Sequence, residues 1–464
     1  MINLQASEIA KIVGGELIGD DVIITASPVF DSSTATAGSI FLALKGEKAD
    51  GHSYINDAFK NGAVLAFVTA PSAQRCVVVP DVIVALSKLA TYVREQLKDL
   101  KVIAITGSQG KTTTKDLLQH ILDSVGKTVA PLGNFNNELG TPITLLQCDE
   151  TTKFCILEMG ARHIGDIAAL CQMAKPNIGI VLRVGTAHIG EFGSAEAVAT
   201  AKSEMISALD QSATAILGQY DEFTKQMRSL HKGDVLTFGE STSADVRATD
   251  IEIREGRPHF DLVTPAGRAA VGLRIVGIHQ VANALAAASA ASALGASIDL
   301  IAGALSTAEV HSKWRMQISE FNGFVLINDV YNSSPESAEA ALRTLVLFAQ
   351  ERGGQSWAFL GKMHELGASS RERHAAIGTL ASVLGIDHLV CIAAPEYAEK
   401  VSGDLAMSVH LFESKDRALS LVDQMRSGDV ILVKASRAEA FEDIAQAITS
   451  RIQKMQSNTE EGES

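Results

Sequence analysis

The sequence contains no long uninterrupted apolar run and carries an excess of negative charge. Its longest apolar segment, from Val281 to Ala296, is interrupted by polar residues and glycine, so we expect a packed helix and no integral membrane segment. The first residues lack the basic segment and apolar core of a secretory signal. The net charge of −14 argues against nucleic acid as a partner, because nucleic-acid-binding proteins use Lys and Arg to neutralise phosphates.

Cysteine is scarce, and its spacing excludes the usual cysteine-based sites. The number of cysteines, five, is odd, and no two of them form a C-x-x-C pair. This argues against both a disulfide framework and a zinc site. We expect reduced, mostly buried thiols and a cytoplasmic protein. The cysteines are Cys76, Cys148, Cys155, Cys171 and Cys391.

The chain of 464 residues is too long for one ordinary hydrophobic core, so several domains are expected. A helical segment from Val84 to Leu100 precedes the first glycine-bounded loop, which places a boundary near residue 98. An alanine-rich helix closes the next region near residue 310. The predicted domains are residues 1–98, 99–311 and 312–464.

The apolar runs predict an α/β fold throughout. Ser7 is expected to cap a first helix that ends at Gly14. The middle region repeats strand, loop and helix, and changes to short alternating strands between about Ala213 and Val276. We therefore predict a small N-terminal α/β domain, a central domain with a parallel sheet plus a small β-sheet, and a Rossmann-like C-terminal domain. The strands predicted in the outer domains are Val22–Thr25, Ile40–Leu44, Val64–Val68, Cys76–Val79, Phe324–Ile327, Trp357–Leu360, His388–Ile392 and Val430–Val433.

A short glycine-bounded loop between a strand and a helix predicts an ATP site. An apolar run from Val102 ends at Gly107, and helical spacing of apolar residues follows Lys111. Such a loop offers backbone N–H groups and a helix N-terminus to phosphates. Lys111 is expected to contact the β- and γ-phosphates, and Thr112 to hold Mg²⁺. The loop residues expected to bind the nucleotide are Gly107, Ser108, Gln109, Gly110, Lys111, Thr112 and Thr113.

This loop is shorter than the standard phosphate-binding loop. The standard motif has a glycine five residues before the Gly-Lys pair, where this chain has Ile105. A chance turn between a strand and a helix is the alternative interpretation. Two further residues follow predicted parallel strands, Glu158 after Phe154–Leu157 and His188 after Ile178–Leu182. Because ligands bind at the carboxyl ends of such strands, Glu158, His188 and Lys111 are expected to share one site.

Three further clusters make the chain resemble the Mur ligases, the ATP-dependent amide-forming enzymes of peptidoglycan precursor synthesis. They are Gly133–Pro142, Glu158–His163 and Leu360–Gly367. With the short loop, they occur in the family's order, and the resemblance runs from about Asp31 to Arg437. It implies a three-domain ATP-dependent ligase that adds D-alanyl-D-alanine to UDP-N-acetylmuramoyl-tripeptide through an acyl phosphate. We expect it to be a monomer.

The resemblance also implies which residues bind the uridine diphosphate substrate. Family members often carry arginine where this chain has Ser33, so one contact to the diphosphate is in question. Taken alone, the Asp50-Gly51-His52 run would be an ordinary surface turn. The substrate-binding residues implied are Ser32, Lys45, Gly46, Asp50, His52, Asn134 and Asn137.

For the catalytic centre, the resemblance implies two Mg²⁺ ions. One is held near Thr112, and the second by Glu158, His188 and a carbamylated Lys202. Without the family, Glu158 and His188 would be solvated or structural side chains, and Lys202 an exposed helix lysine. The implied catalytic residues are Lys111, Lys202 and His188, and the further nucleotide contacts are Asn283, Arg315 and Asp329. Arg183 stands where relatives usually have asparagine.

Other functions use a similar loop. A ligase resembling folylpolyglutamate synthetase shares the short loop but usually lacks the third threonine, here Thr114, and the run from Glu158 to Arg162. The Mur ligase that adds the third amino acid carries an Asp-Asn-Pro-Arg-like motif that is absent here. An ATP-binding switch or scaffold would need no acceptor amine. ATP turnover that requires both a nucleotide-sugar peptide and a dipeptide distinguishes these functions.

Overall fold

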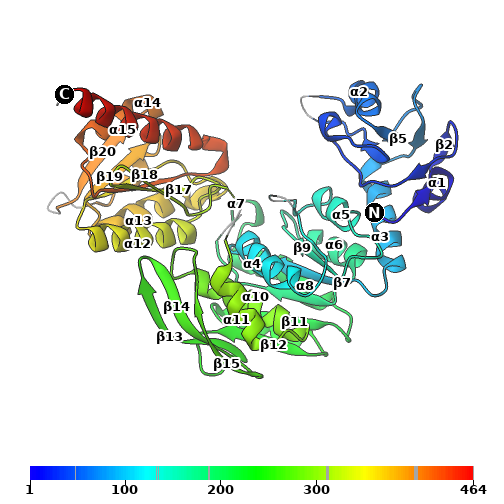
Figure 1. Cartoon of the computed structure of the whole chain (residues 1–464), viewed down its shortest axis with the longest axis horizontal. Coiled ribbons are helices and arrows are strands. Elements are labelled where there is room, and N and C mark those ends of the chain that lie inside the picture. The colour runs from blue at the N-terminus through cyan, green and yellow to red at the C-terminus, as the bar shows by residue number, and fades with distance from the viewer. Residues whose placement is uncertain are drawn as a thin grey trace.

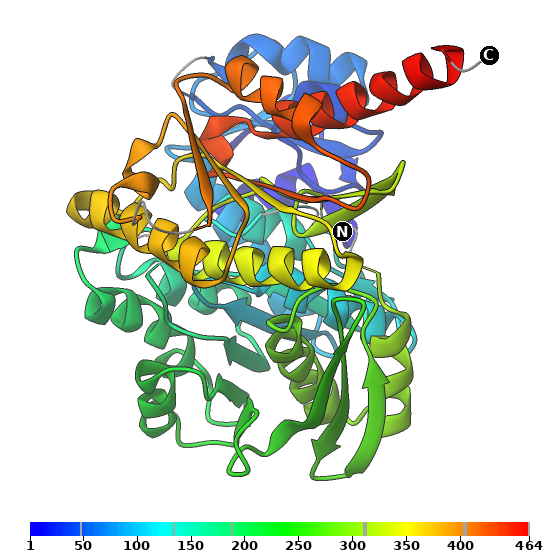
Figure 2. The ribbon, with the colours of Figure 1, turned by 90° about the vertical axis from the view of Figure 1, so that its left-hand side faces the viewer.

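The computed structural model describes residues 1–46, 49–131, 133, 135–186, 189–309, 313–401 and 406–462, the last eight by their backbone alone. Three large sheets follow one another along the chain, with four, nine and six strands. In Figure 1 the first and the last of these sheets lie on opposite sides above the central one. Figure 2 turns the C-terminal unit toward the viewer. The predicted three-part α/β architecture is confirmed, and the exact domain boundaries stay predictions.

The N-terminal unit contains a small mixed sheet. Three of the four strands predicted for this unit belong to the sheet, and the one predicted at Val22–Thr25 lies outside it. Its order is β2–β6–β5–β4, and β1 pairs with β3 in a separate two-stranded sheet. Helix α3 packs against α1 on one side and against α5 and α6 of the central unit on the other. The elements are β1 (Leu4–Gln5), α1 (Ala6–Val13), β2 (Glu16–Ile18), β3 (Ile23–Ile24), η1 (Ser32–Thr34), β4 (Ser39–Leu42), η2 (Gly51–Tyr54), α2 (Ile55–Lys60), β5 (Ala63–Val68), β6 (Cys76–Val78) and α3 (Val82–Gln96).

The first helix differs from its prediction at one end. It ends at Gly14, whose φ of 73° is the left-handed conformation that glycine adopts without steric cost. Ser7, however, does not cap the helix, which already begins at Ala6. The Ser7 hydroxyl instead donates a hydrogen bond to Asp21 Oδ2 over 2.6 Å. The Asp21 carboxylate, in the loop between β2 and β3, is the stronger acceptor, and the sequence pattern does not show that it lies nearby.

The central unit is built on one continuous sheet of nine strands. Its order is β15–β14–β13–β12–β11–β10–β7–β9–β8, and strands β8 to β13 are parallel. The antiparallel strands β13 to β15 extend this sheet through a short pairing of β12 with β13. The strands are β7 (Lys101–Thr106), β8 (Thr128–Val129), β9 (Phe154–Glu158), β10 (Ile178–Val181), β11 (Thr214–Gly218), β12 (Val235–Gly239), β13 (Val246–Arg254), β14 (Arg257–Thr264) and β15 (Gly267–Gly272).

Helices cover both faces of the central sheet (Figures 1 and 2). Helix α4 follows the glycine-bounded loop and packs against α10 and α11. Most residues of α10 are buried, and many of them are alanine or another small residue, which lets α4 and α10 approach closely. The helices are α4 (Lys111–Asp123), α5 (Gly140–Leu145), α6 (Asp166–Ala174), α7 (Ile189–Phe192), α8 (Ala195–Ser207), α9 (Glu222–Gln226), η3 (Met227–Leu230), α10 (Gln280–Ala293) and α11 (Ile298–Thr307).

The C-terminal unit is a six-stranded sheet ordered β16–β17–β21–β18–β19–β20. The four predicted strands form its centre, and β16 and β20 are edge strands that the apolar runs did not predict. Only β16 is antiparallel to its neighbour. The elements are β16 (Gln317–Phe321), β17 (Phe324–Asp329), α12 (Pro335–Arg352), β18 (Ser356–Leu360), η4 (Gly367–Ser369), α13 (Ser370–Val383), β19 (His388–Ile392), η5 (Pro395–Ala398), β20 (Ser408–Phe412), α14 (Lys415–Ala418), η6 (Leu419–Gln424), β21 (Val430–Lys434), η7 (Arg437–Glu439) and α15 (Glu442–Gly462).

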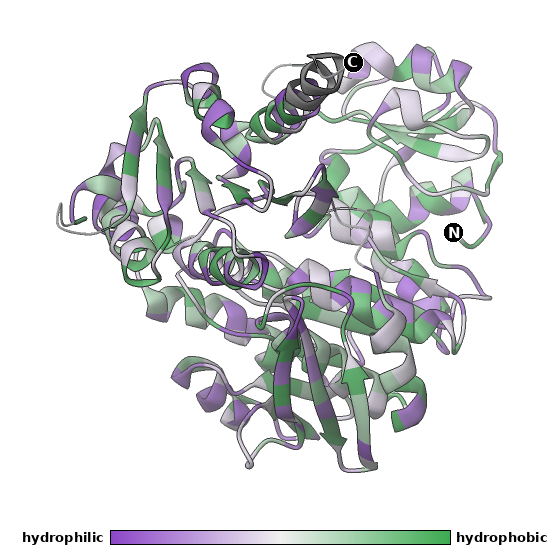
Figure 3. Cartoon of the chain, turned by 60° about the vertical axis from the view of Figure 1, so that its left-hand side comes forward, coloured by the Kyte–Doolittle hydropathy of each residue, from purple (hydrophilic) through white to green (hydrophobic). Residues whose placement is uncertain are grey.

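Hydrophobic and polar residues alternate along many strands and helices (Figure 3), and the buried hydrophobic residues form clusters between the sheets and the helices packed on them. One apolar cluster runs without a break from the N-terminal helices into the central sheet, so these two units share part of their core. All five cysteines are free and buried, as predicted. In the part of the chain that the structure describes, we find no helix with both the length and the apolar character that a membrane span requires.

Candidate active site

The glycine-bounded loop lies between the end of β7 at Thr106 and the start of α4 at Lys111. Gly110 has a φ of 87°, and a Cβ there would come within 2.3 Å of Asn283 Oδ1. The backbone conformation at this position favours glycine, and a side chain here would also displace the Asn283 amide. The loop presents the N-terminus of a helix of 13 residues, which is the geometry that binds phosphates.

Lys111 and Glu158 form the charged centre of the site. The Lys111 ammonium donates to the Gly107 carbonyl over 2.8 Å, and Thr112 Oγ1 donates to Glu158 Oε2 over 3.2 Å. Desolvation lowers the pKa of Lys111, although the nearby Glu158 carboxylate acts in the opposite direction. Burial also raises the pKa of Glu158, against the effect of Lys111. Each charge is held where a low-dielectric surrounding strengthens its interaction with a charged ligand.

Glu158 fits the ligand role that the resemblance implies for it. Its side chain is 1% exposed, yet Oε1 has no hydrogen-bond partner among the described residues. A buried carboxylate oxygen without a donor is costly unless a cation or another group completes it. Mg²⁺ commonly takes one or two protein carboxylates together with phosphate oxygens and water. The Thr112 hydroxyl and the Glu158 carboxylate are such a donor set.

Lys202 is a buried lysine on α8 rather than an exposed one. Its residue exposure is 4%, and it lies on the same side of the helix as Val198 and Met205, which are also buried. Burial, with a smaller effect of the Lys111 charge, lowers the pKa of Lys202 to about 7. A substantial fraction of this amine is therefore neutral near neutral pH. The surface-charge interpretation of Lys202 does not agree with this environment.

Arg315 is presented by a strained turn. Trp314 and Met316, on either side of it, have φ values of 64° and 49°, which non-glycine residues rarely adopt. The Arg315 guanidinium stacks on the Tyr331 ring at 3.7 Å, and its charge acts on Lys111 and Glu158. Backbone strain of this kind costs about 1–3 kcal/mol per residue and is typical of functional sites.

A cavity of about 310 Å³ lies between the first turn of α4, which follows the glycine-bounded loop (from here on the phosphate loop), and the start of the C-terminal unit. Thr113, Gln280 and Arg315 are among its lining residues. Asn283 lies beside it on α10, donating to Gln280 Oε1 over 2.7 Å. The cavity therefore brings together residues predicted separately as nucleotide contacts. It has room for a base or a sugar next to the phosphate loop.

Asp329 lies at the end of β17 and is held by a buried ion pair. Lys434 Nζ, at the end of the neighbouring strand β21, donates to Asp329 Oδ2 over 2.5 Å and to the Asn332 carbonyl over 2.9 Å. The Lys434 side chain is 1% exposed. Met316 N–H donates to Asp329 Oδ1 over 3.1 Å, so Asp329 also fixes the turn next to Arg315.

Replacing Lys434 with alanine is expected to destabilise the C-terminal unit by about 3–5 kcal/mol, because it leaves the Asp329 carboxylate buried without its partner. Urea unfolding followed by tryptophan fluorescence measures this, since both tryptophans, Trp314 and Trp357, belong to that unit. Arg451→Ala, which removes an exposed pair with Asp423, is the control and should leave the unfolding midpoint almost unchanged. Equal shifts for the two variants would contradict the assigned role of the buried pair.

The predicted substrate residues of the N-terminal unit lie in loops around β4 and β5. Ser32 begins η1, and its carbonyl accepts a hydrogen bond from Asn61 Nδ2 over 2.9 Å. The backbones of Lys45 and Asp50 pair in an isolated antiparallel β-bridge, and the Gly46 N–H donates to the Ala49 carbonyl. The main structural partners of Asp50 are the backbone N–H of His52 and its ring Nδ1, at 3.0 and 2.7 Å.

Two predicted site residues, His188 and Asn134, lie outside the described residues. Near the second of these, Asn137 Oδ1 accepts a hydrogen bond from the Gly140 N–H over 3.0 Å at the start of α5. The Phe135 ring meets Phe30 of the N-terminal unit edge to face, with centroids 6.0 Å apart. The loop of predicted substrate residues in the central unit therefore touches the N-terminal unit.

Arg183 follows β10 and lies beside the phosphate loop through its backbone. Its carbonyl accepts the Ser108 N–H over 3.0 Å. The side chain is not simply in solvent, since Nε is buried without a partner among the described residues. Burial raises the pKa of the Tyr220 phenol, and the Arg183 charge opposes this increase.

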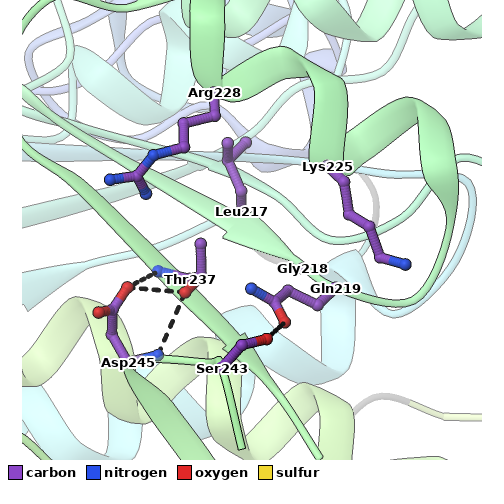
Figure 4. A pocket seen from close by; sticks show the side chains of 8 residues that line it. All are labelled: Leu217, Gly218, Gln219, Lys225, Arg228, Thr237, Ser243 and Asp245. Carbon is purple, nitrogen blue, oxygen red and sulfur yellow. Dashed lines mark hydrogen bonds between the residues drawn. The ribbon is translucent and has the colours of Figure 1, made fainter. Parts of the chain in front are cut away.

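A second cavity, of about 280 Å³, lies at the ends of β11 and β12 (Figure 4). The charged ends of Lys225 and Arg228 point to different sides of it. Asp245 is already bonded to Thr237, and Lys225 to Glu222. Its lining residues include none of those predicted to bind nucleotide or substrate, so it is separate from the phosphate loop.

Three family models match successive parts of the chain. They are the Mur ligase family catalytic domain at residues 29–108, the Mur ligase middle domain at 105–291, and the Mur ligase glutamate ligase domain at 314–437. The UDP-N-acetylmuramoyl-tripeptide--D-alanyl-D-alanine ligase of Mycobacterium tuberculosis is 38% identical over 97% of this chain and 98% of its own. The chain belongs to the Mur ligase family.

Solved structures show the same relationship. MurF from Acinetobacter baumannii is 34% identical, with a TM-score of 0.87 over 96% of this chain and 99% of that chain. MurF ligase from Thermotoga maritima, solved in complex with ADP, is 28% identical, with a TM-score of 0.79 over 92% of this chain and 99% of that chain. This Mur ligase therefore has the MurF-type fold along nearly its whole length.

Sequence reasoning missed several residues that the structure brings to the site of this Mur ligase. Tyr331 stacks on Arg315, and Glu336 of the C-terminal unit binds Thr186 of the central one. An aromatic residue two positions after Asp329 was the available signal for Tyr331. No comparable signal existed for Glu336, because its partner is 150 positions away.

Proposed function

We propose that this protein is the ligase that joins UDP-N-acetylmuramoyl-tripeptide to D-alanyl-D-alanine in peptidoglycan precursor synthesis, consuming ATP and releasing ADP and phosphate. The observation that carries the proposal is the 38% identity to a ligase of that name over 97% of the chain. The phosphate loop with its buried charges supports it, because amide formation from a carboxylate requires activation by ATP.

The proposed reaction requires positive charge at the phosphate loop. A carboxylate is anionic and its oxygen is a poor leaving group, so it is first phosphorylated by ATP to an acyl phosphate. The free amine of the dipeptide then attacks the acyl carbon, and the tetrahedral intermediate expels phosphate. The first step brings two anions together. The Lys111 ammonium screens them and stabilises charge on the transferred phosphoryl group.

We assign Mg²⁺ to the donor set of Thr112 and Glu158, and a second Mg²⁺ to Glu158, His188 and Lys202. When bound, Mg²⁺ supplies positive charge that neutralises the phosphates. The unpartnered Oε1 of Glu158 supports this assignment. His188 enters it on the family resemblance alone.

Lys202 is proposed to be carbamylated. An ammonium has three donors and no lone pair, so it cannot bind a cation. A neutral amine forms an N–C bond with CO₂ and releases a proton to water, which gives a carbamate anion with two oxygens that suits Mg²⁺. Burial on α8 and a pKa of about 7 support this role, because they supply the neutral amine that the reaction needs.

We assign ATP and the uridine diphosphate end of the other substrate to different units. The cavity beside Thr113 and Arg315 is assigned to ATP, with Asn283 and Asp329 as further nucleotide contacts. The N-terminal loops with Ser32, Lys45, Gly46, Asp50 and His52 are assigned to the uridine diphosphate end, and Asn134 and Asn137 to the bound peptide substrate. Closure of the C-terminal unit over the central one would exclude water from the acyl phosphate.

We further propose that the enzyme works as a monomer in the cytoplasm. The five free, buried cysteines agree with a reducing compartment.

Release of ADP from purified enzyme tests the proposal against its rivals. We expect release only when the UDP-linked tripeptide and D-alanyl-D-alanine are both present. Release that depends on a folate and glutamate, or on the UDP-linked dipeptide and a single amino acid, would favour a different ligase. ATP binding without turnover under any of these conditions would favour a switch or scaffold.

A further inference from the structure

A short loop after β10 connects the phosphate loop to the rest of the enzyme. We call residues 183–186 the bridging segment. The Ser108 N–H donates to the carbonyl of Arg183 over 3.0 Å, and the Gly185 N–H donates back to Ser108 Oγ over 2.8 Å. The Val184 N–H donates to Asp221 Oδ2 over 3.0 Å. The position of Ser108 is thus set by the bridging segment.

The far end of the bridging segment is bound by the C-terminal unit. Glu336 is the second residue of α12, and its Oε1 accepts both the N–H and the Oγ1–H of Thr186, each over 2.7 Å. A Cβ on Gly185 would lie 3.1 Å from the same oxygen. Burial, the largest single effect, would raise the pKa of Glu336, but the hydrogen bonds from Thr186, together with those from the Glu336 N–H and Ser334, hold the pKa below its ordinary value. An ionised acceptor at a helix N-terminus makes strong hydrogen bonds.

A second contact holds the same part of the central unit. The Gly190 N–H donates to the Glu365 carbonyl over 2.9 Å, and a Cβ on Gly190 would lie 2.6 Å from the Gly367 nitrogen. The C-terminal unit therefore meets the region after β10 at two points four residues apart. Only the first of these, Glu336 with Thr186, is made by a side chain.

We propose that Glu336 is a positioning residue that transmits the position of the C-terminal unit to the phosphate loop, through Thr186, the bridging segment and Ser108. In this arrangement the loop is held for phosphate binding when α12 is seated against the central unit. Without Glu336, the bridging segment keeps its contacts to Ser108 and Asp221 but loses the contact that orders its end. The expected effect on turnover rests on the proposed function, whereas the expected effect on ADP binding does not.

The test compares Glu336→Ala and Glu336→Gln with Glu339→Ala. Glu339 lies on the exposed side of the same helix and pairs with Arg343, so its loss should change nothing. Glu336→Ala should lower kcat by roughly ten- to a hundredfold, since hydrogen bonds to a charged acceptor are lost. Glu336→Gln keeps an acceptor oxygen and should lose less. The KM for the UDP-linked substrate and the melting temperature should stay close to those of the parent enzyme.

A double-mutant cycle with Thr186→Val tests the pathway itself. We expect the losses in kcat, or in ADP affinity measured by calorimetry, to be smaller in the double variant than the sum of the single losses. ADP binds without the peptide substrates, so ADP affinity tests the role of Glu336 even in an enzyme that forms no product. An enzyme that binds ADP but forms no product would refute the proposed function alone. Additive losses, or a Glu336→Ala enzyme within about twofold of the parent in both quantities, would overturn the inference.

Discussion

Replacing Lys111 with alanine is expected to lower turnover by on the order of a hundredfold or more. Lys111 begins α4, bonds to the Gly107 carbonyl and shares its environment with Glu158, which is why we propose that its charge acts on the transferred phosphate. The loss should fall on kcat at saturating ATP, because the ammonium stabilises charge that increases during transfer. Steady-state kinetics of ADP release measure it.

The fold should survive this change, because the Lys111 side chain makes a single hydrogen bond among the described residues. Far-UV circular dichroism and the melting temperature check this. Lys101→Ala is the matched control, since Lys101 is an exposed lysine at the other end of strand β7. Near-normal turnover of the Lys111→Ala enzyme at saturating ATP would remove Lys111 from the mechanism.

Replacing Lys202 with alanine is expected to leave the enzyme nearly inactive, because no carbamate can form. A small carboxylate such as acetate or formate should restore part of the activity by occupying the place of the carbamate oxygens. Rescue of this kind separates a missing anion from a damaged fold. Thr200→Ala, on the exposed side of α8, is the control and should keep full activity.

The modification also has a readout that does not depend on turnover. Parent enzyme equilibrated with ¹³C-labelled bicarbonate should show a carbamate carbon signal that the Lys202→Ala enzyme lacks. The pKa of about 7 supplies neutral amine at neutral pH, so the signal should be present under assay conditions. A Lys202→Ala enzyme with the parent rate and Mg²⁺ dependence would show that the lysine is not a metal ligand.

The parts of the site that could be predicted from sequence are those that depend on local pattern. The strand before Gly107, the glycines and the helix after Lys111 are adjacent in the chain, and the structure places them together. Glu158 could be predicted because parallel strands end at one edge of a sheet, and its register beside β7 agrees with this. The burial of Lys202 did not follow from its helix pattern, and the resemblance implied only that its side chain is carbamylated.

The parts that could not be predicted depend on pairing between distant residues. The contact of Glu336 with Thr186 and the ion pair of Lys434 with Asp329 join positions more than 100 residues apart. A short pairing of β12 with β13 merges the two sheets predicted for the central domain into one, and the sequence does not show which residues of the two strands pair. Edge strands β16 and β20 have mixed exposure and lack the continuous apolar run of a central strand.

The identity of the product tests the proposed ligase activity most directly. Purified enzyme is incubated with the UDP-linked tripeptide, ATP and Mg²⁺, and with either D-alanyl-D-alanine or D-alanine alone, and the products are analysed by mass spectrometry. The proposed activity requires a UDP-linked pentapeptide with the dipeptide, formed in step with ADP, and no product with the single amino acid. Product formation with D-alanine alone, and none with the dipeptide, would contradict it.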